Sequence, residues 1–312
     1  MMENTSKRKI SIITEIIIFC IILVAIVFLF YYFYKPQTII NNDNNIVQNS
    51  LLDESKSKET IEAENKMYIK NIKDEYGIKV RYGEDIELFA TKVGASAQYD
   101  ANILNNNLKI IYKALEKYPD SVFEMSRSKK YPITIFVLDK FSNDNLALAA
   151  RSSLNEFRLY ISNTPKFERA FHHEMYHLLE YYMQDTKMYL YSSWNNLNPV
   201  DFKYESDVSK LNDKYVYKEI TENLIDEESI TSEYIEDEVL SDDSINPYFV
   251  TKYSKVTEKE DRAEIFAEIM ILSIKPRYLY KEQNIRKKAE LLDNTIKVNI
   301  TNEDFFYTKF LK

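Results

Sequence analysis

The sequence predicts an α+β fold for the larger part of the chain, and three observations support this prediction. Segments in which apolar residues recur with helical spacing alternate with short apolar or alternating runs, which are typical of strands. Only three of the 312 residues are glycine and seven are proline, so few tight turns are available and helices are favoured. No internal repeat is visible, so a repeat architecture is not indicated.

The composition is that of a folded, acidic protein. Apolar residues make up 45% of the chain and charged residues 29%, which is enough to form a sizeable core. The net charge of −8 argues against a nucleic-acid-binding protein, because such a protein needs a basic surface. Cys20 is the single cysteine, so no disulfide can form within the chain. The sequence does not indicate an oligomeric state.

The first 34 residues contain a predicted membrane anchor. No charge occurs from Ile16 to Tyr34, and a helix of this length spans roughly the 30 Å hydrocarbon core. Basic residues at 7–9 place residues 1–9 in the cytoplasm and the C-terminal part outside the cell. We therefore expect a single-pass protein of the cell membrane with an uncleaved signal anchor at residues 10–34. A cleaved signal peptide is the alternative, but its apolar region is usually shorter and ends in small residues.

A polar linker at residues 35–60 separates the anchor from the predicted domain, because this stretch is rich in Asn, Ser, Asp and Lys. Five segments then predict secondary structure. They are a helix ending near Gly77, a strand at Ile78–Tyr82, a helix at Asn102–Tyr118, a buried strand at Ile133–Leu138 and a half-buried strand at Glu156–Ser162. Thr164 and Pro165 follow, and they are typical of the start of a sixth element, a helix.

All three histidines lie in this last helix. His173 and His177 frame the pattern H-E-x-x-H, and residues four apart share one face of a helix, so both rings can reach a single tetrahedral zinc ion. Glu174 projects on the same side, where it can accept a proton from water. His172 points off this face and is expected to pack or to form a hydrogen bond. The pattern therefore predicts a zinc site with Glu174 as the catalytic base.

A catalytic zinc site needs a third protein ligand, and no further histidine exists to supply it. The segment Ala263–Leu272 is apolar except for Glu264 and Glu268, which predicts a buried helix whose two carboxylates need compensation. We expect zinc to compensate Glu264 and a ligand histidine to donate a hydrogen bond to Glu268. A solvated pair of glutamates four residues apart is the alternative.

The HHEMYH segment at 172–177 and the segment from Tyr253 to Glu268 resemble the peptidase domain shared by anthrax lethal factor and the secreted Pro-Pro endopeptidases. The resemblance implies a zincin-like α+β domain at residues 61–312, with a small mixed sheet around the active helix. It also implies a gluzincin-type zinc endopeptidase with Zn²⁺ as its cofactor and a protein or peptide as its substrate.

The same resemblance implies roles for individual residues. Glu264 matches the third zinc ligand, and Glu268 matches a glutamate next to the ligands. Tyr253 matches a tyrosine that stabilises the tetrahedral intermediate, and Tyr248 is the alternative for this role. The strand at Glu156–Ser162 matches the strand that pairs with the peptide substrate.

An acidic insertion at about residues 205–247 separates the two motifs. Eleven acidic residues and no basic residue lie between Lys218 and Lys252, and such a run is usually a solvated surface segment. A sharper hypothesis is an acidic wall near the cleft that favours basic substrates. Calcium-binding spacing of the EF-hand type is absent. Upstream, Trp194–Pro199 is interpreted either as a structural segment or as a rim of the cleft.

The combined hypothesis is a membrane-anchored, zinc-dependent endopeptidase that hydrolyses extracellular or surface proteins. The alternative is an anchored cell-surface binding protein with a structural or vestigial zinc site. A purely structural site has four protein ligands, so the three ligands predicted here favour the enzyme. The sequence does not specify which bond is cleaved.

Overall fold

The computed structural model describes residues 57–311 except 144, 153–154, 187–192, 218–246 and 272–281. A mixed sheet of five strands lies at its centre, in the order β1-β3-β5-β4, with β2 paired to the later part of β3. Neighbours β1, β3 and β5 run parallel, whereas β2 and β4 are antiparallel to their partners. The strands are β1 (Lys79–Arg81), β2 (Ala95–Ala97), β3 (Ile133–Phe141), β4 (Ala147–Arg151) and β5 (Phe157–Ser162). The predicted α+β class with a small mixed sheet is confirmed.

Helices of very different length surround the sheet. The α-helices are α2 (Lys58–Tyr76), α3 (Glu87–Lys92), α4 (Ala101–Leu115), α5 (Glu124–Arg127), α6 (Phe167–Thr186), α7 (Glu258–Ile271), α9 (Gln283–Asn299) and α10 (Thr308–Leu311). Short 3₁₀ turns are η1 (Gly83–Ile86), η2 (Asp120–Phe123), η3 (Trp194–Leu197), η4 (Val208–Lys210) and η5 (Tyr253–Lys255). The helix predicted to end near Gly77 does so, because Gly77 takes the left-handed conformation and its N–H bonds back to Lys73.

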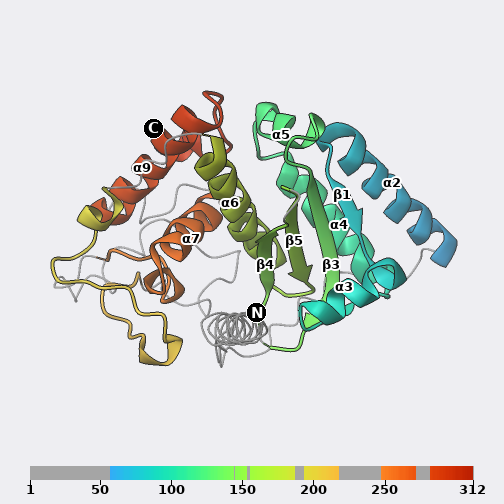
Figure 1. Cartoon of the computed structure of the whole chain (residues 1–312), viewed down its shortest axis with the longest axis horizontal. Coiled ribbons are helices and arrows are strands. Elements are labelled where there is room, and N and C mark those ends of the chain that lie inside the picture. The colour runs from blue at the N-terminus through green and yellow to red at the C-terminus, as the bar shows by residue number, and fades with distance from the viewer. Residues whose placement is uncertain are drawn as a thin grey trace, which may run out of the picture. The chain divides into compact units, whose positions relative to one another are not determined.

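The two faces of the sheet are covered differently. One face packs against α4 and α6 and forms the main core with side chains such as Ile135, Leu159 and Phe171. The other face carries a smaller core under η1 and α3, in which Phe136 stacks on Tyr160. Helix α6 contacts both the sheet and α7, so it lies between them (Figure 1). The helix with the histidines is therefore held from two sides.

The strand predictions differ from the structure in the burial of β5 and in the absence of β2 and β4 among them. Strand β5 was predicted to be half-buried, but almost all of it is buried because it lies between β3 and β4 and the smaller core covers its second face. Strand β4 was not predicted, because its sequence Ala-Leu-Ala-Ala-Arg lacks the β-branched and aromatic residues that mark strands. β4, not β5, is the edge of the sheet next to α6.

Helix α6 begins slightly later than its sequence suggests. The Thr164 hydroxyl accepts a hydrogen bond from the N–H of Lys166 at 3.3 Å, and the Thr164 carbonyl accepts one from the N–H of Phe167. This turn leads into the helix at Phe167. Along the helix, Phe171, Met175 and Leu178 are fully buried. These apolar contacts fix the orientation of α6 and thereby the direction of its histidines.

Helix α7 begins earlier than predicted. The apolar segment Ala263–Leu272 indicated its later part, but the helix starts at Glu258. Thr257 caps this start, since its hydroxyl accepts from the N–H of Glu260 and its carbonyl from the N–H of Asp261. Glu260 consequently lies within the helix.

A buried carboxylate anchors the first turns of α7. Asp261 Oδ2 accepts hydrogen bonds from Lys288 Nζ of α9 at 2.7 Å, from Trp194 Nε1 of η3 at 2.9 Å and from the Tyr204 hydroxyl at 2.9 Å. The side chains of Asp261 and Lys288 are both fully buried. Lys288 also lies 4.0 Å from the ring centroid of Phe249, a cation–π contact. The segment around Trp194 is therefore structural in this respect, because it holds α7 in place.

Several predictions concern parts of the chain that lie outside the described residues. These are the cytoplasmic N-terminus, the anchor at 10–34, most of the linker, and the acidic run between 218 and 246. The described residues on either side of this run lie together, since Val216 bridges to Phe249. Within the part of the chain that the structure does describe, no helix combines the length and the apolar character needed to cross a bilayer.

The Asp261–Lys288 pair gives a first prediction. Asp261→Ala should lower the free energy of unfolding by about 3–5 kcal/mol, because it leaves a buried ammonium without its carboxylate. Chemical denaturation of the metal-free protein measures this loss. The double variant Asp261→Ala/Lys288→Met should be more stable than Asp261→Ala alone, since it buries no unpaired charge. A double variant that is no more stable than the single one would contradict the ion-pair explanation.

Candidate metal centre

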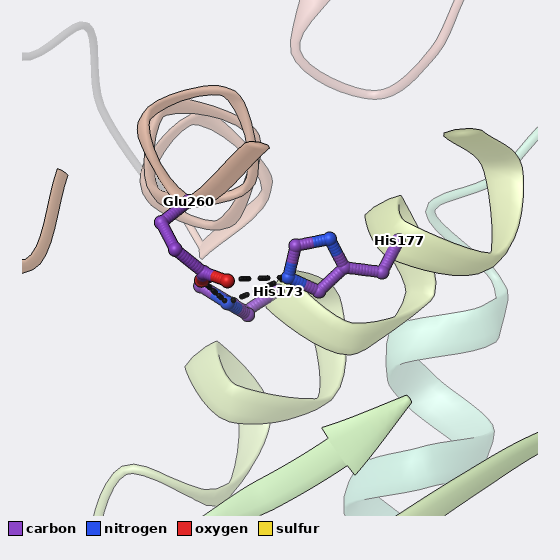
Figure 2. A group of neighbouring side chains, drawn as sticks. All are labelled: His173, His177 and Glu260. Atoms are coloured by element: carbon purple, nitrogen blue, oxygen red, sulfur yellow. Dashed lines mark hydrogen bonds and ion pairs between the residues drawn. The ribbon is translucent and has the colours of Figure 1, made fainter. Parts of the chain in front are cut away.

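Three metal-ligating side chains from two helices converge between α6 and α7. Figure 2 shows His173 and His177 projecting from α6 toward Glu260, which projects from α7. One ring nitrogen from each histidine and one carboxylate oxygen all lie within 4.8 Å of one another. His173 is buried, whereas His177 and Glu260 are partly exposed. Two of the three residues are the histidines of the H-E-x-x-H pattern.

The spacing of these three atoms fits a tetrahedral zinc ion. The Nε2 atoms of His173 and His177 are 3.2 Å apart, and Glu260 Oε2 lies 2.9 Å from the first and 3.5 Å from the second. Zinc bonds of roughly 2.0–2.1 Å in tetrahedral geometry place neighbouring ligand atoms about 3.3 Å apart. Two imidazole nitrogens that face each other at this distance also need a proton or a cation between them. The donor set and its dimensions therefore match those needed to hold a zinc ion.

Glu264, the predicted third ligand, occupies a different position. Its Oε1 accepts a hydrogen bond from Nδ1 of His173 at 2.8 Å, on the opposite edge of the ring from Nε2. Since a carboxylate only accepts, Nδ1 carries a proton, which leaves Nε2, the nitrogen that faces His177 and Glu260, as the one that could bind a metal ion. In this structure Glu260 takes the place expected for Glu264, and Glu264 accepts the hydrogen bond from Nδ1 of His173.

Glu268, which was expected to accept a hydrogen bond from a ligand histidine, pairs with the Nε of Arg169. Arg169 also donates to both oxygens of Glu264, at 3.2 and 2.6 Å, and the Thr251 hydroxyl donates to Oε2 of Glu264. The Glu264 side chain is only 2% exposed. These contacts exclude the alternative of a solvated glutamate pair.

Electrostatics keep the carboxylates of this centre ionised. Burial would raise the pKa of Glu264, but Arg169 and His173 outweigh it and hold this pKa well below its usual range. The pKa of Glu260 is likewise lowered, because His177 and His173 outweigh burial. Burial would lower the pKa of His173, yet hydrogen bonds to Glu260 and Glu264 raise it to about 10. The carboxylates of the centre thus stay ionised and stabilise positive charge next to them.

Glu174 lies beside this centre and is buried at 8% exposure. Its carboxylate accepts a hydrogen bond from the backbone N–H of Ala149 in β4. Burial raises its pKa, although His173 and His177 act in the opposite direction. A carboxylate with a raised pKa is suited to take up and release a proton near neutral pH.

Tyr253 is the better placed of the two tyrosines considered for the intermediate. Its ring centroid lies 5.9 Å from that of His173, and its hydroxyl lies near the carboxylate of Glu260. Burial and the nearby Glu260 and Glu174 raise its pKa well above the ordinary value, so the hydroxyl stays protonated. Tyr248 instead packs on Tyr215, with ring centroids 5.6 Å apart. Tyr253 therefore has a proton to donate next to the centre.

His172 has no place among the ligands, as expected. It is fully buried and its Nδ1 forms a hydrogen bond of 2.8 Å with the hydroxyl of Tyr118. Burial lowers its pKa to about 4, so the ring is neutral. The residue ties α6 to the end of α4.

Glu260 is the member of this cluster that the sequence analysis did not identify. It lies before Ala263–Leu272, the apolar segment that indicated the buried carboxylates. A signal was present, because Thr257-x-x-Glu260 has the form of a capping box and indicates a helix that starts at residue 258. In the structure Thr257 does cap the helix, while the Glu260 side chain turns to the imidazoles.

Comparison with known proteins adds little detail to this centre. No family model matches the sequence, and no curated protein matches it. Among solved structures, the chain is similar to a candidate zinc-binding metallo-peptidase from Bacteroides caccae ATCC 43185. The similarity covers 82% of this chain and 92% of that one, with 13% sequence identity and a TM-score of 0.48. At this level the likeness does not indicate which residues act.

Proposed function

We propose that the chain is a zinc-dependent metallopeptidase of the zincin type. One observation carries the proposal: His173, His177 and Glu260 form three corners of a tetrahedral site, and a buried glutamate lies directly beside them. Three protein ligands leave a fourth position for water or substrate, which distinguishes a catalytic zinc site from a structural one. The resemblance of the two motif segments to gluzincin peptidases supports the same function.

The residues around the centre have complementary tasks. A zinc ion held by His173, His177 and Glu260 would supply Lewis acidity toward a peptide carbonyl and toward water. The Glu174 carboxylate takes a proton from the attacking water and then delivers it to the nitrogen of the leaving amine. The raised pKa of Glu174 suits both steps, because the group must gain the proton and lose it again in each turnover.

The tyrosine next to the centre supports the attack step of this mechanism. The protonated Tyr253 hydroxyl is positioned to donate a hydrogen bond to the oxygen that becomes negative as the carbonyl is attacked. Such donors act where charge develops and are typically worth a few kcal/mol in catalysis. The hydroxyl lies near the carboxylate of Glu260, one of the proposed zinc ligands.

The free edge of β4 is the proposed place for the substrate backbone. The resemblance suggested β5, but both edges of β5 are already paired, with β3 and β4. In β4 the bonding register leaves the backbone groups of Ala147, Ala149 and Arg151 directed away from β5. Because the N–H of Ala149 reaches Glu174, a peptide added along this edge would lie beside the catalytic base.

We further propose that the enzyme is anchored in the cell membrane by residues 10–34 and acts on extracellular or surface proteins. The uncharged run and the basic residues before it support this arrangement. The alternative, an anchored binding protein with a vestigial zinc site, would not need a buried proton acceptor next to three ligands.

Glu174→Gln tests the mechanism. The variant should lose peptide hydrolysis by at least about 100-fold, because the amide cannot accept the proton. It should retain one zinc per chain by metal analysis, since Glu174 is not a ligand. Hydrolysis of a peptide library provides the activity measurement. Glu168→Gln makes the same chemical change on the same helix, next to Lys117, and should keep most of the activity. A Glu174→Gln variant that still hydrolyses peptides would refute the mechanism.

The anchor gives a separate prediction. The full chain should remain in the membrane fraction after an alkaline wash, because an apolar helix of this length inserts stably. Deletion of residues 10–34 should move the protein into the soluble fraction. Release of the full chain by the wash would contradict an integral anchor and would leave the peptidase proposal standing.

A further inference from the structure

Helix α7 carries three glutamates at equal intervals. Glu260, Glu264 and Glu268 are four residues apart, so each lies roughly one helical turn of 5.4 Å further along almost the same face. A shift of α7 by one turn would bring Glu264 to the imidazoles in place of Glu260. The local sequence of α7 does not distinguish these two registers, so contacts to other elements must do so.

Arg169 makes the contacts that distinguish them. It lies one turn before His173 on α6. Its guanidinium contacts the carboxylates of Glu264 and Glu268, neither of which faces Nε2 of His173. Two of its nitrogens donate to the oxygens of Glu264, and a third donates to Glu268. Burial would lower the pKa of Arg169, but Glu264 and Glu268 raise it, so the side chain stays charged. Of the three glutamates, the one that Arg169 does not contact is Glu260.

A second ion pair between α6 and α7 is buried and lies at the other end of the contact between these two helices. Arg262 Nε of α7 donates to Glu180 Oε1 of α6 at 2.7 Å, and both side chains are at most 2% exposed. Here the arginine belongs to α7 and the glutamate to α6, the reverse of the Arg169 contacts. The two arginine contacts lie on either side of the histidine pair along α6. A shift of one turn would separate both sets of charges, which is costly in a buried contact.

We propose that Arg169 is the positioning residue that makes Glu260 the third metal ligand. It holds Glu264 against Nδ1 of His173 and retains Glu268, so neither carboxylate can turn to the ion. This inference rests on the proposed zinc site and assigns the residue that determines its ligand set. Arg169 acts through Glu264 and does not touch the ion or the reacting atoms.

Zinc affinity of the full chain tests the proposal. Arg169→Met keeps the apolar stem and removes the charge, and it should weaken zinc binding about 10–100-fold, as loss of a residue behind a ligand typically does. Arg169→Lys provides one point charge for two carboxylates and should lie between the wild type and Arg169→Met. A competing chromogenic chelator measures the affinity, and the absorption spectrum of the Co²⁺-loaded protein reports the coordination.

Arg127 offers a matched control. It also contacts two carboxylates, Asp120 and Glu124, and it is 24% exposed where Arg169 is 21% exposed. Arg127→Met should lower the thermal stability and leave the zinc affinity and the Co²⁺ spectrum unchanged. If Arg169→Met also lowers only the stability, its role is merely structural and the proposal is overturned.

A double-mutant cycle tests the choice of ligand directly. With Arg169 present, Glu260→Gln should abolish tight zinc binding, because Glu264 is held elsewhere. In the Arg169→Met background the same substitution should weaken binding by a smaller factor, since the released Glu264 can supply an oxygen. Equal losses in both backgrounds would show that Arg169 does not withhold Glu264, and would overturn the proposal.

These outcomes are separable from failure of the proposed function. A wild-type chain that binds zinc but hydrolyses no peptide removes the peptidase and leaves the affinity measurements to decide on Arg169. A wild-type chain without a stoichiometric zinc site overturns both.

Discussion

The packing of α6 against α7 is the constraint on which the rest of the centre depends. The two helices run in opposite directions along their contact, since Arg169 near the start of α6 meets Glu268 late in α7, and His177 meets Glu260. Ionised carboxylates lie inside this contact, and buried charge is tolerated only when it is paired. Arginine compensates part of it, and the imidazole pair with its proposed cation compensates the rest.

The surrounding fold serves to keep that contact in one arrangement. The sheet supports α6 from one side through the main core, while α9, η3 and the buried Asp261 support α7 from the other. Strand β4 completes the arrangement, because it lies against α6 and its Ala149 N–H reaches Glu174. The proposed ligands, the proposed base and the sheet edge are thus carried by helices and strands, which is what precise catalytic geometry requires.

Local periodicity explains how much of this could be predicted from the sequence. Helices α2, α4 and α6, strands β1, β3 and β5, and the histidine pair on α6 follow from spacing within one element. β4 was missed because alanine and leucine do not favour strands, and its pairing with β5 is a contact between segments. Helix α9 was also missed, although Ile285, Leu292 and Ile296 carry helical spacing. The sequence favoured Glu264 over Glu260 as the third ligand, because equally spaced glutamates look alike until the contacts of Arg169 on another helix are considered.

The assignment of Glu260 as the third ligand is tested most directly by crystals of the zinc-loaded protein measured at the zinc absorption edge. We expect a single anomalous peak within bonding distance of His173 Nε2, His177 Nε2 and a carboxylate oxygen of Glu260, with Glu264 remaining on Nδ1 of His173. Absence of a peak at this position, or a peak bonded to Glu264 in place of Glu260, would contradict it.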